Sequence, residues 1–131
     1  MTRKEELFAY ALNNYGVEPD YPFSIAPTYA VLRHQSNRKW FALFGDVKRC
    51  QLGLDGDEKV DIVNLKCGPI LAGSLRLEDG YFPAYHMKHD GWVSVLLDGS
   101  VAMEDIIPLL DMSYELTTPK LKGKRKKNQS Y

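Results

Sequence analysis

The feature that most constrains this fold is a pair of short strand-like segments joined by only four residues. Residues 28–34 and 39–44 are rich in aromatic, β-branched and long apolar side chains, and residues 35–38 separate them. A connection this short joins antiparallel neighbours, because parallel strands need a crossover of roughly a dozen residues or more. Residues 60–66 form a third strand-like run, expected to pair beside the second. The chain is therefore predicted to build a mainly antiparallel sheet.

Strict alternation of side chains predicts the two faces of the second strand. It places Phe41 and Leu43 on one face with Lys39. It places Trp40, Ala42 and Phe44 on the other face.

The N-terminal segment carries helix signals at both ends. Thr2 and Glu5 form a capping box, in which each side chain satisfies a backbone N–H of the other position. Gly16 can adopt the left-handed conformation that ends a helix. The apolar residues between these signals fall on one stripe, which is typical of a helix that covers a core. They are Leu7, Phe8, Ala11, Leu12 and Tyr15.

Two more helices and one more strand complete the predicted order. A short helix is expected to begin near Pro69, and residues 92–97 are a continuous apolar run typical of a buried strand. Residues 46–58 form a turn-rich insert with room for one helical turn. Pro108 interrupts the apolar stripe of the last helix and is expected to delay its start or to kink it. The resulting order is α-β-β-β-α-β-α, an α+β fold with helices packed on one face of the sheet.

Charge divides the chain into two parts. Residues 1–119 hold 11 basic and 17 acidic residues, a net charge of −6, and form the single predicted domain. Residues 120–131 hold the other six basic residues and no acidic residue, so this tail is expected to be disordered. Such a tail can contact phosphates non-specifically, or it can serve only to solubilise and neutralise its own domain.

Several classes of protein are disfavoured by the sequence. The first residues run directly into an amphipathic pattern without an apolar signal core, and no apolar run approaches the roughly 20 residues that span a bilayer. Cys50 and Cys67 form no disulfide framework. We therefore expect a cytoplasmic protein without a membrane partner. Because edge strands of a small sheet can pair between copies, we expect a monomer or a weak dimer.

Short motifs follow one another over residues 1–118. They are Asp20-Tyr21-Pro22-Phe23, Lys39-Trp40-Phe41-Ala42, Asn64-Leu65-Lys66-Cys67 with Pro69, Leu75-Arg76, Pro83-Ala84-Tyr85-His86-Met87-Lys88 with Trp92, Leu97-Asp98-Gly99 and Ser113-Tyr114. In this order they resemble the MmcQ/YjbR family of small bacterial proteins. The resemblance implies a frataxin-like α+β fold, also described as a double-wing DNA-binding arrangement. It also implies DNA binding, the label that this family commonly carries.

One set of basic and aromatic residues predicts a binding surface. Its members are Lys39, Lys66, Arg76, Tyr85, His86, Lys88 and Trp92. The cations would contact phosphates or carboxylates, and the rings would offer flat area for stacking. The structural alternative is that Tyr85 and Trp92 are core residues. The cations Lys66, Lys88 and Arg76 would then pair with Asp61, Asp98 or Glu78.

Two functional hypotheses use this surface. A continuous positive stripe favours a nucleic-acid-binding module, although the −6 charge of the domain opposes it unless the cations are segregated. A concave cluster around Lys39, Lys66, Lys88 and Trp92 favours a regulatory module that binds a small anion, and a flat apolar patch there favours a protein partner.

Signatures of catalysis and of metal binding are missing from the sequence. It holds no G-x-S-x-G elbow, P-loop or dinucleotide fingerprint. Cys67 with His86 would be the one nucleophile–base pair, but Cys67 is better explained as a small buried hydrophobe. His86, His89 and Asp90 lack the spacing of a known metal motif. We expect no enzymatic activity, no cofactor and no bound metal.

Overall fold

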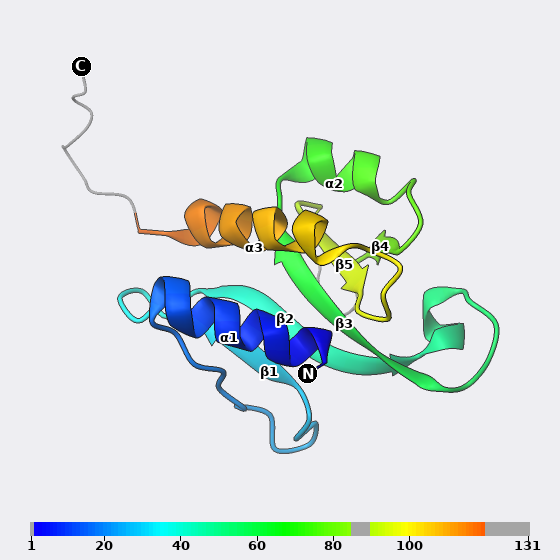
Figure 1. The fold of residues 1–131 in the computed structure, drawn as a ribbon, viewed down its shortest axis with the longest axis horizontal. Coiled ribbons are helices and arrows are strands. Elements are labelled where there is room, and N and C mark those ends of the chain that lie inside the picture. Colours follow the sequence, from blue (N-terminus) through cyan, green and yellow to red (C-terminus); the bar gives the residue numbers. More distant parts are fainter. Residues whose placement is uncertain (1, 85–89, 120–131) are drawn as a thin grey trace.

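The computed structural model describes residues 2–84 and 90–119. Its elements are α1 (Arg3–Tyr15), β1 (Ala30–Arg33), β2 (Trp40–Lys48), the 3-10 turn η1 (Arg49–Leu52), β3 (Lys59–Lys66), α2 (Pro69–Leu75), β4 (Tyr81–Pro83), β5 (Trp92–Leu96) and α3 (Met103–Thr117). The described strands form one sheet in the order β1-β2-β3-β5-β4, with antiparallel neighbours throughout. Helices α1 and α3 lie on the same face of this sheet (Figure 1). The predicted α+β class is confirmed.

The predicted order of elements lacked one strand. β4 is only three residues long, too short for any alternating pattern to show in the sequence, and it forms the edge beside β5. The helical turn expected in the insert is confirmed as η1. β2 also runs four residues beyond its predicted end. Gly45 makes this extension fit, because a Cβ atom there would lie 2.6 Å from Cε2 of the Tyr29 ring.

Pro108 does not delay the last helix. α3 begins at Met103 and continues through Pro108 to Thr117, so the expectation of a delayed start is wrong. The missing N–H of Pro108 leaves the carbonyl of Glu104 without its helical partner. Both residues are exposed, so water can satisfy that carbonyl.

A β-bulge overturns the predicted faces of β2. Leu32 pairs with Ala42 but Arg33 pairs with Trp40, so Phe41 is an extra residue in the ladder. The bulge lets Phe41 join Ala42 and Phe44 in the core on the helix side, whereas strict alternation separated them.

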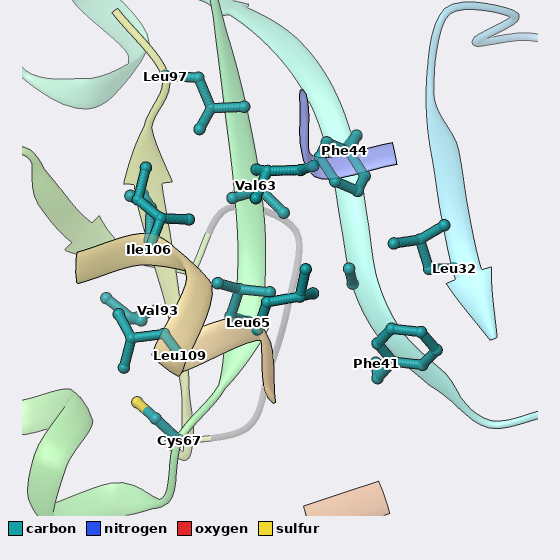
Figure 2. Close-up of a cluster of buried hydrophobic side chains, with 14 of the residues drawn as sticks. Leu32, Phe41, Phe44, Val63, Leu65, Cys67, Val93, Leu97, Ile106 and Leu109 are labelled. Atoms are coloured by element: carbon teal, nitrogen blue, oxygen red, sulfur yellow. The ribbon is translucent and has the colours of Figure 1, made fainter. Parts of the chain in front are cut away.

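The main core lies between the sheet and the helices. Figure 2 shows side chains of the central strands meeting those of α3. The labelled residues of this cluster are Leu32, Phe41, Phe44, Val63, Leu65, Cys67, Val93, Leu97, Ile106 and Leu109. Cys67 is buried among them, and burial raises the pKa of its thiol. The expectation that Cys67 serves as a small buried hydrophobe is confirmed.

The C-terminal end of α3 is fixed to the hairpin between β1 and β2. The Nε2 atom of His34 lies 2.7 Å from Oγ1 of Thr117, and Asn37 Nδ2 donates to the Thr117 carbonyl over 3.1 Å. The His34 ring also lies 4.4 Å from that of Tyr114, which stacks on Tyr15 of α1 at 4.1 Å. The last turn of α3 therefore lies against this hairpin.

His34 makes stability depend on pH. Its side chain is almost fully buried, and this burial lowers its pKa below the usual value of 6.5. Because the unfolded chain then binds a proton more readily than the folded one, stability is complete above pH 6.5 and falls as the pH drops below it. The loss is at most about 1.4 kcal/mol per pH unit.

Urea unfolding of the wild type and of His34→Gln between about pH 5 and 8 checks this expectation. The difference between the two proteins cancels contributions from the other titrating groups. A difference that does not change with pH would contradict the buried, neutral state of His34.

Candidate functional site

Four strands end or begin at one end of the sheet, here called the hairpin end. β1 ends there at Arg33, β2 begins at Trp40, β3 ends at Lys66 and β5 begins at Trp92. The opposite end, here called the insert end, carries η1 and the turn before α3.

Two cross-strand pairs of residues lie at the hairpin end, on the face turned away from α1 and α3. Leu65 and Cys67 belong to the core on the helix side, so Lys66 between them faces outward. Trp92 is its partner on β5 and precedes the core residue Val93. On the same face, toward the β1 edge of the sheet, Arg33 of β1 pairs with Trp40 of β2. Taken in the order of the strands, these four residues, here called the outer row, alternate cation and aromatic ring: Arg33, Trp40, Lys66 and Trp92.

The members of the outer row differ in accessibility. Trp92 is only 6% exposed, whereas Trp40 and Lys66 are partly exposed. The ring of Phe23, from the loop between α1 and β1, meets the Trp40 ring edge-to-face with centroids 5.6 Å apart. Arg33 forms an ion pair with Asp20 of the same loop. Trp40 is thus the aromatic ring of the row that solvent reaches.

The structure brings three of the predicted site residues to this end. Lys39 is exposed and immediately precedes Trp40, while Lys66 and Trp92 stand opposite each other. Arg76 approaches the same region, because its Nη2 atom donates to the Asp90 carbonyl over 2.9 Å. Its Nε atom donates to the Ala72 carbonyl over 3.2 Å, so carbonyl oxygens orient the guanidinium without neutralising it. The other predicted residues, Tyr85, His86 and Lys88, lie outside the described residues.

The structural alternative holds only in part. Trp92 is buried, as that alternative expected. Within residues 2–84 and 90–119, however, the ion pairs are Arg33–Asp20 and Lys59–Asp46. Neither Lys66 nor Arg76 forms the expected pair with Asp61, Asp98 or Glu78, so their positive charges stay available to a ligand.

Acidic groups gather at the other end of the molecule. The carboxylates there are Glu5, Glu6, Asp46, Asp55, Asp57, Glu58, Asp61, Glu78, Asp79, Asp98, Glu104 and Asp105. They outnumber the cations of that end, which are Arg3, Lys4, Lys48, Arg49 and Lys59. The other described charged residues balance one another: Arg33, Arg38, Lys39, Lys66 and Arg76 against Glu18, Asp20, Asp90, Asp111 and Glu115. The −6 charge of the domain is therefore concentrated away from the outer row.

Two hollows have been located along the described chain. One, of about 660 Å³, follows β4 and is lined by Arg76 together with Arg49, Tyr81 and Phe82. The other, of about 460 Å³, lies between α2 and Met112 of α3 and is mainly apolar. Neither is lined by Lys39 or Lys66, so these hollows do not form the predicted concave cluster.

Metal binding and membrane insertion find no support in the described part of the chain. Within it, no group of three or more His, Cys, Asp or Glu side chains is placed to hold a metal ion. None of its helices is long and apolar enough to cross a bilayer. His86 and His89 lie outside the described residues.

Three residues of this surface were not predicted from the sequence: Arg33, Trp40 and Phe23. Strict alternation put Trp40 on the same face as the core residues Ala42 and Phe44, and only the bulge at Phe41 turns it outward. The available signal was the position of Trp40 directly after Lys39, where a basic and an aromatic residue adjoin.

Comparisons with known proteins agree with this architecture, and the family described as YjbR matches residues 12–116. The chain belongs to the YjbR family. Its relatives include the "Uncharacterized protein YyaQ" of Bacillus subtilis, 40% identical over 117 residues, which are 89% of this chain and 99% of the relative. A crystal structure of a Pseudomonas syringae protein, 42% identical, superposes with a TM-score of 0.85 over 90% of this chain and 100% of that chain. A crystal structure of a Deinococcus radiodurans protein, 26% identical, superposes with a TM-score of 0.71 over 97% of this chain and 88% of that chain.

Proposed function

We propose that this protein is a non-enzymatic nucleic-acid-binding module of the cytoplasm that uses the hairpin end as its contact surface. The observation that carries the proposal is the alternation of cation and aromatic ring along the outer row, with Lys39 exposed beside it. Lysine and arginine attract phosphates, and aromatic rings add sequence-tolerant contacts with bases.

The distribution of charge supports the same surface. An acidic domain repels nucleic acid unless its cations are segregated from its carboxylates. Here the excess of carboxylates lies at the insert end, and Lys66 is free of the expected acidic partners. The six basic residues of the tail follow Pro119 in the sequence and add positive charge to the full chain.

Anisotropy binding to labelled single-stranded and duplex DNA over a salt series tests the proposal. The slope of log K against log salt is negative, and each lost phosphate contact reduces its magnitude by about 0.9 for a duplex and by about 0.7 for a single strand. We expect Lys66→Ala and Lys39→Ala each to weaken binding and to reduce the magnitude of the slope by about one such contact.

Lys59→Ala is the matched control. It removes the same charge, but Lys59 lies at the insert end, with a side chain that is 66% exposed and paired with Asp46. We expect its affinity to stay close to that of the wild type. Equal losses of affinity in all three variants would show that binding depends only on the net charge of the protein.

A chain that ends at Pro119 separates the domain from the tail. Binding that survives this truncation, and still depends on Lys66, supports the outer row as the contact surface. Binding that disappears with the tail would contradict the proposal. It would favour the alternative, in which the domain binds a small anion or a protein partner.

A further inference from the structure

We propose that the outer row binds unpaired nucleotides, so that the ligand is single-stranded nucleic acid rather than a duplex. This inference rests on the proposed function and adds to it a site of base stacking at Trp40. No residue of the row other than Trp40 offers an aromatic ring that solvent reaches, because Trp92 is buried.

The pair of Trp40 and Phe23 provides the stacking platform. Their rings meet at an interplanar angle of 88° with centroids 5.6 Å apart, so Phe23 supports the indole from one direction while Trp40 stays partly exposed. A ring braced in this way loses little conformational freedom when a base stacks on it. Phe23 is itself partly exposed beside the platform.

Cations flank the platform along two directions. Lys39 precedes Trp40 in the chain and is exposed. Lys66 stands on β3, the strand next to β2, one residue beyond the pair Ala42–Leu65 at which their ladder ends. A nucleotide stacked on Trp40 would thus have its phosphates within reach of one or both ammonium groups. Stacking beside backbone cations is the arrangement by which sheet surfaces bind single strands.

Two physical reasons favour a single strand over a duplex. The faces of bases are buried inside a duplex, so an exposed indole can stack only on unpaired bases. A duplex also carries one charge per roughly 1.7 Å of its axis, against about 3.4 Å for each strand, so the acidic domain repels it more strongly. Both effects act against a duplex at the hairpin end.

Variants of Trp40 distinguish stacking from packing. Trp40→Leu keeps apolar volume but removes the flat ring, and it should weaken oligo-dT binding about 5- to 150-fold, the range measured for one stacked base. Trp40→Phe keeps a flat ring and should stay within about threefold of the wild type. Wild-type indole fluorescence should be quenched by oligo-dT, and Trp40→Phe should abolish most of this quenching because Trp92 is buried.

Phe23→Leu is the second variant, and thermal melting of all variants shows whether they remain folded. Phe23→Leu should weaken oligo-dT binding less than Trp40→Leu does. Oligo-dT and oligo-U are compared in parallel, because phosphates and base faces are common to DNA and RNA. Binding of either that depends on Trp40 supports the inference.

The failure of this inference can be told apart from that of the proposed function. If Lys39→Ala and Lys66→Ala weaken binding but folded Trp40→Leu does not, stacking is overturned and the nucleic-acid surface stands. A duplex bound more tightly than oligo-dT at matched salt would also overturn it. If the wild type binds neither nucleic acid at low salt, both proposals fall.

Discussion

Replacing Phe41 by alanine is expected to lower the free energy of unfolding by about 3–5 kcal/mol, the usual cost of removing a buried phenyl ring. Phe41 is fully buried although it is the extra residue of a bulge. Its ring contacts those of Tyr15, His34 and Tyr114, with centroids 5.5, 5.1 and 5.0 Å away. The substitution therefore removes the ring that joins β2 to α1, α3 and the hairpin. Urea unfolding followed by circular dichroism measures the loss.

Ile25→Ala is the control for this prediction. Ile25 is also a large apolar residue, but it is 97% exposed, so its truncation should change stability by less than about 0.5 kcal/mol. A loss below about 1 kcal/mol for Phe41→Ala would contradict the burial of Phe41 in the core. It would also contradict the bulge that turns Trp40 outward.

Ser113→Ala is expected to cost about 1–3 kcal/mol, because it leaves buried backbone groups without partners. The Ser113 hydroxyl accepts from the Lys66 N–H over 2.9 Å and donates to the Phe41 carbonyl over 2.6 Å. It thus bridges β2 and β3 where the bulge ends their regular ladder. One of these groups belongs to Lys66 and the other to the residue that follows Trp40, so the variant should also weaken nucleic-acid binding.

The matched control is Ser74→Ala, which removes an exposed hydroxyl from α2. Its stability should stay within about 0.5 kcal/mol of the wild type. If Ser113→Ala were as stable as this control, the hydrogen bonds of the Ser113 hydroxyl to the Lys66 N–H and the Phe41 carbonyl would not contribute to stability.

Much of the fold followed from local signals. The capping box of α1 is present in both directions, with Thr2 N 2.9 Å from Glu5 Oε1 and Glu5 N 3.1 Å from Thr2 Oγ1. Gly16 ends the helix with φ at 68°, as expected of a left-handed cap. These features depend on residues close in sequence, which is why the pattern alone predicts them.

The misplaced features depend on distant contacts. Phe41 enters the core because α1, α3 and the hairpin surround it, and Ser113 satisfies its carbonyl from 72 residues away. No local alternation encodes that contact. The strand β4 has too few residues for a pattern, and its place beside β5 is set by pairing across the sheet.

The same distinction explains the candidate site. Lys39, Lys66 and Trp92 were recognisable as a basic and aromatic set, because that set needs only composition and order. The row that they form with Arg33 and Trp40 needs the strand order and the bulge. Phe23 joins it from a loop whose path the sequence does not specify.

The most direct test of the nucleic-acid surface is a titration of the ¹⁵N-labelled full chain with an oligo-dT of about 12 nucleotides, followed by two-dimensional NMR. We predict that the backbone amides of Arg33, Lys39, Trp40, Lys66 and Trp92 shift, and that those of the insert end, such as Lys59, do not. The Trp40 indole N–H should shift more than that of Trp92. Shifts confined to residues 120–131, or centred on the insert end, would contradict the hairpin end as the contact surface.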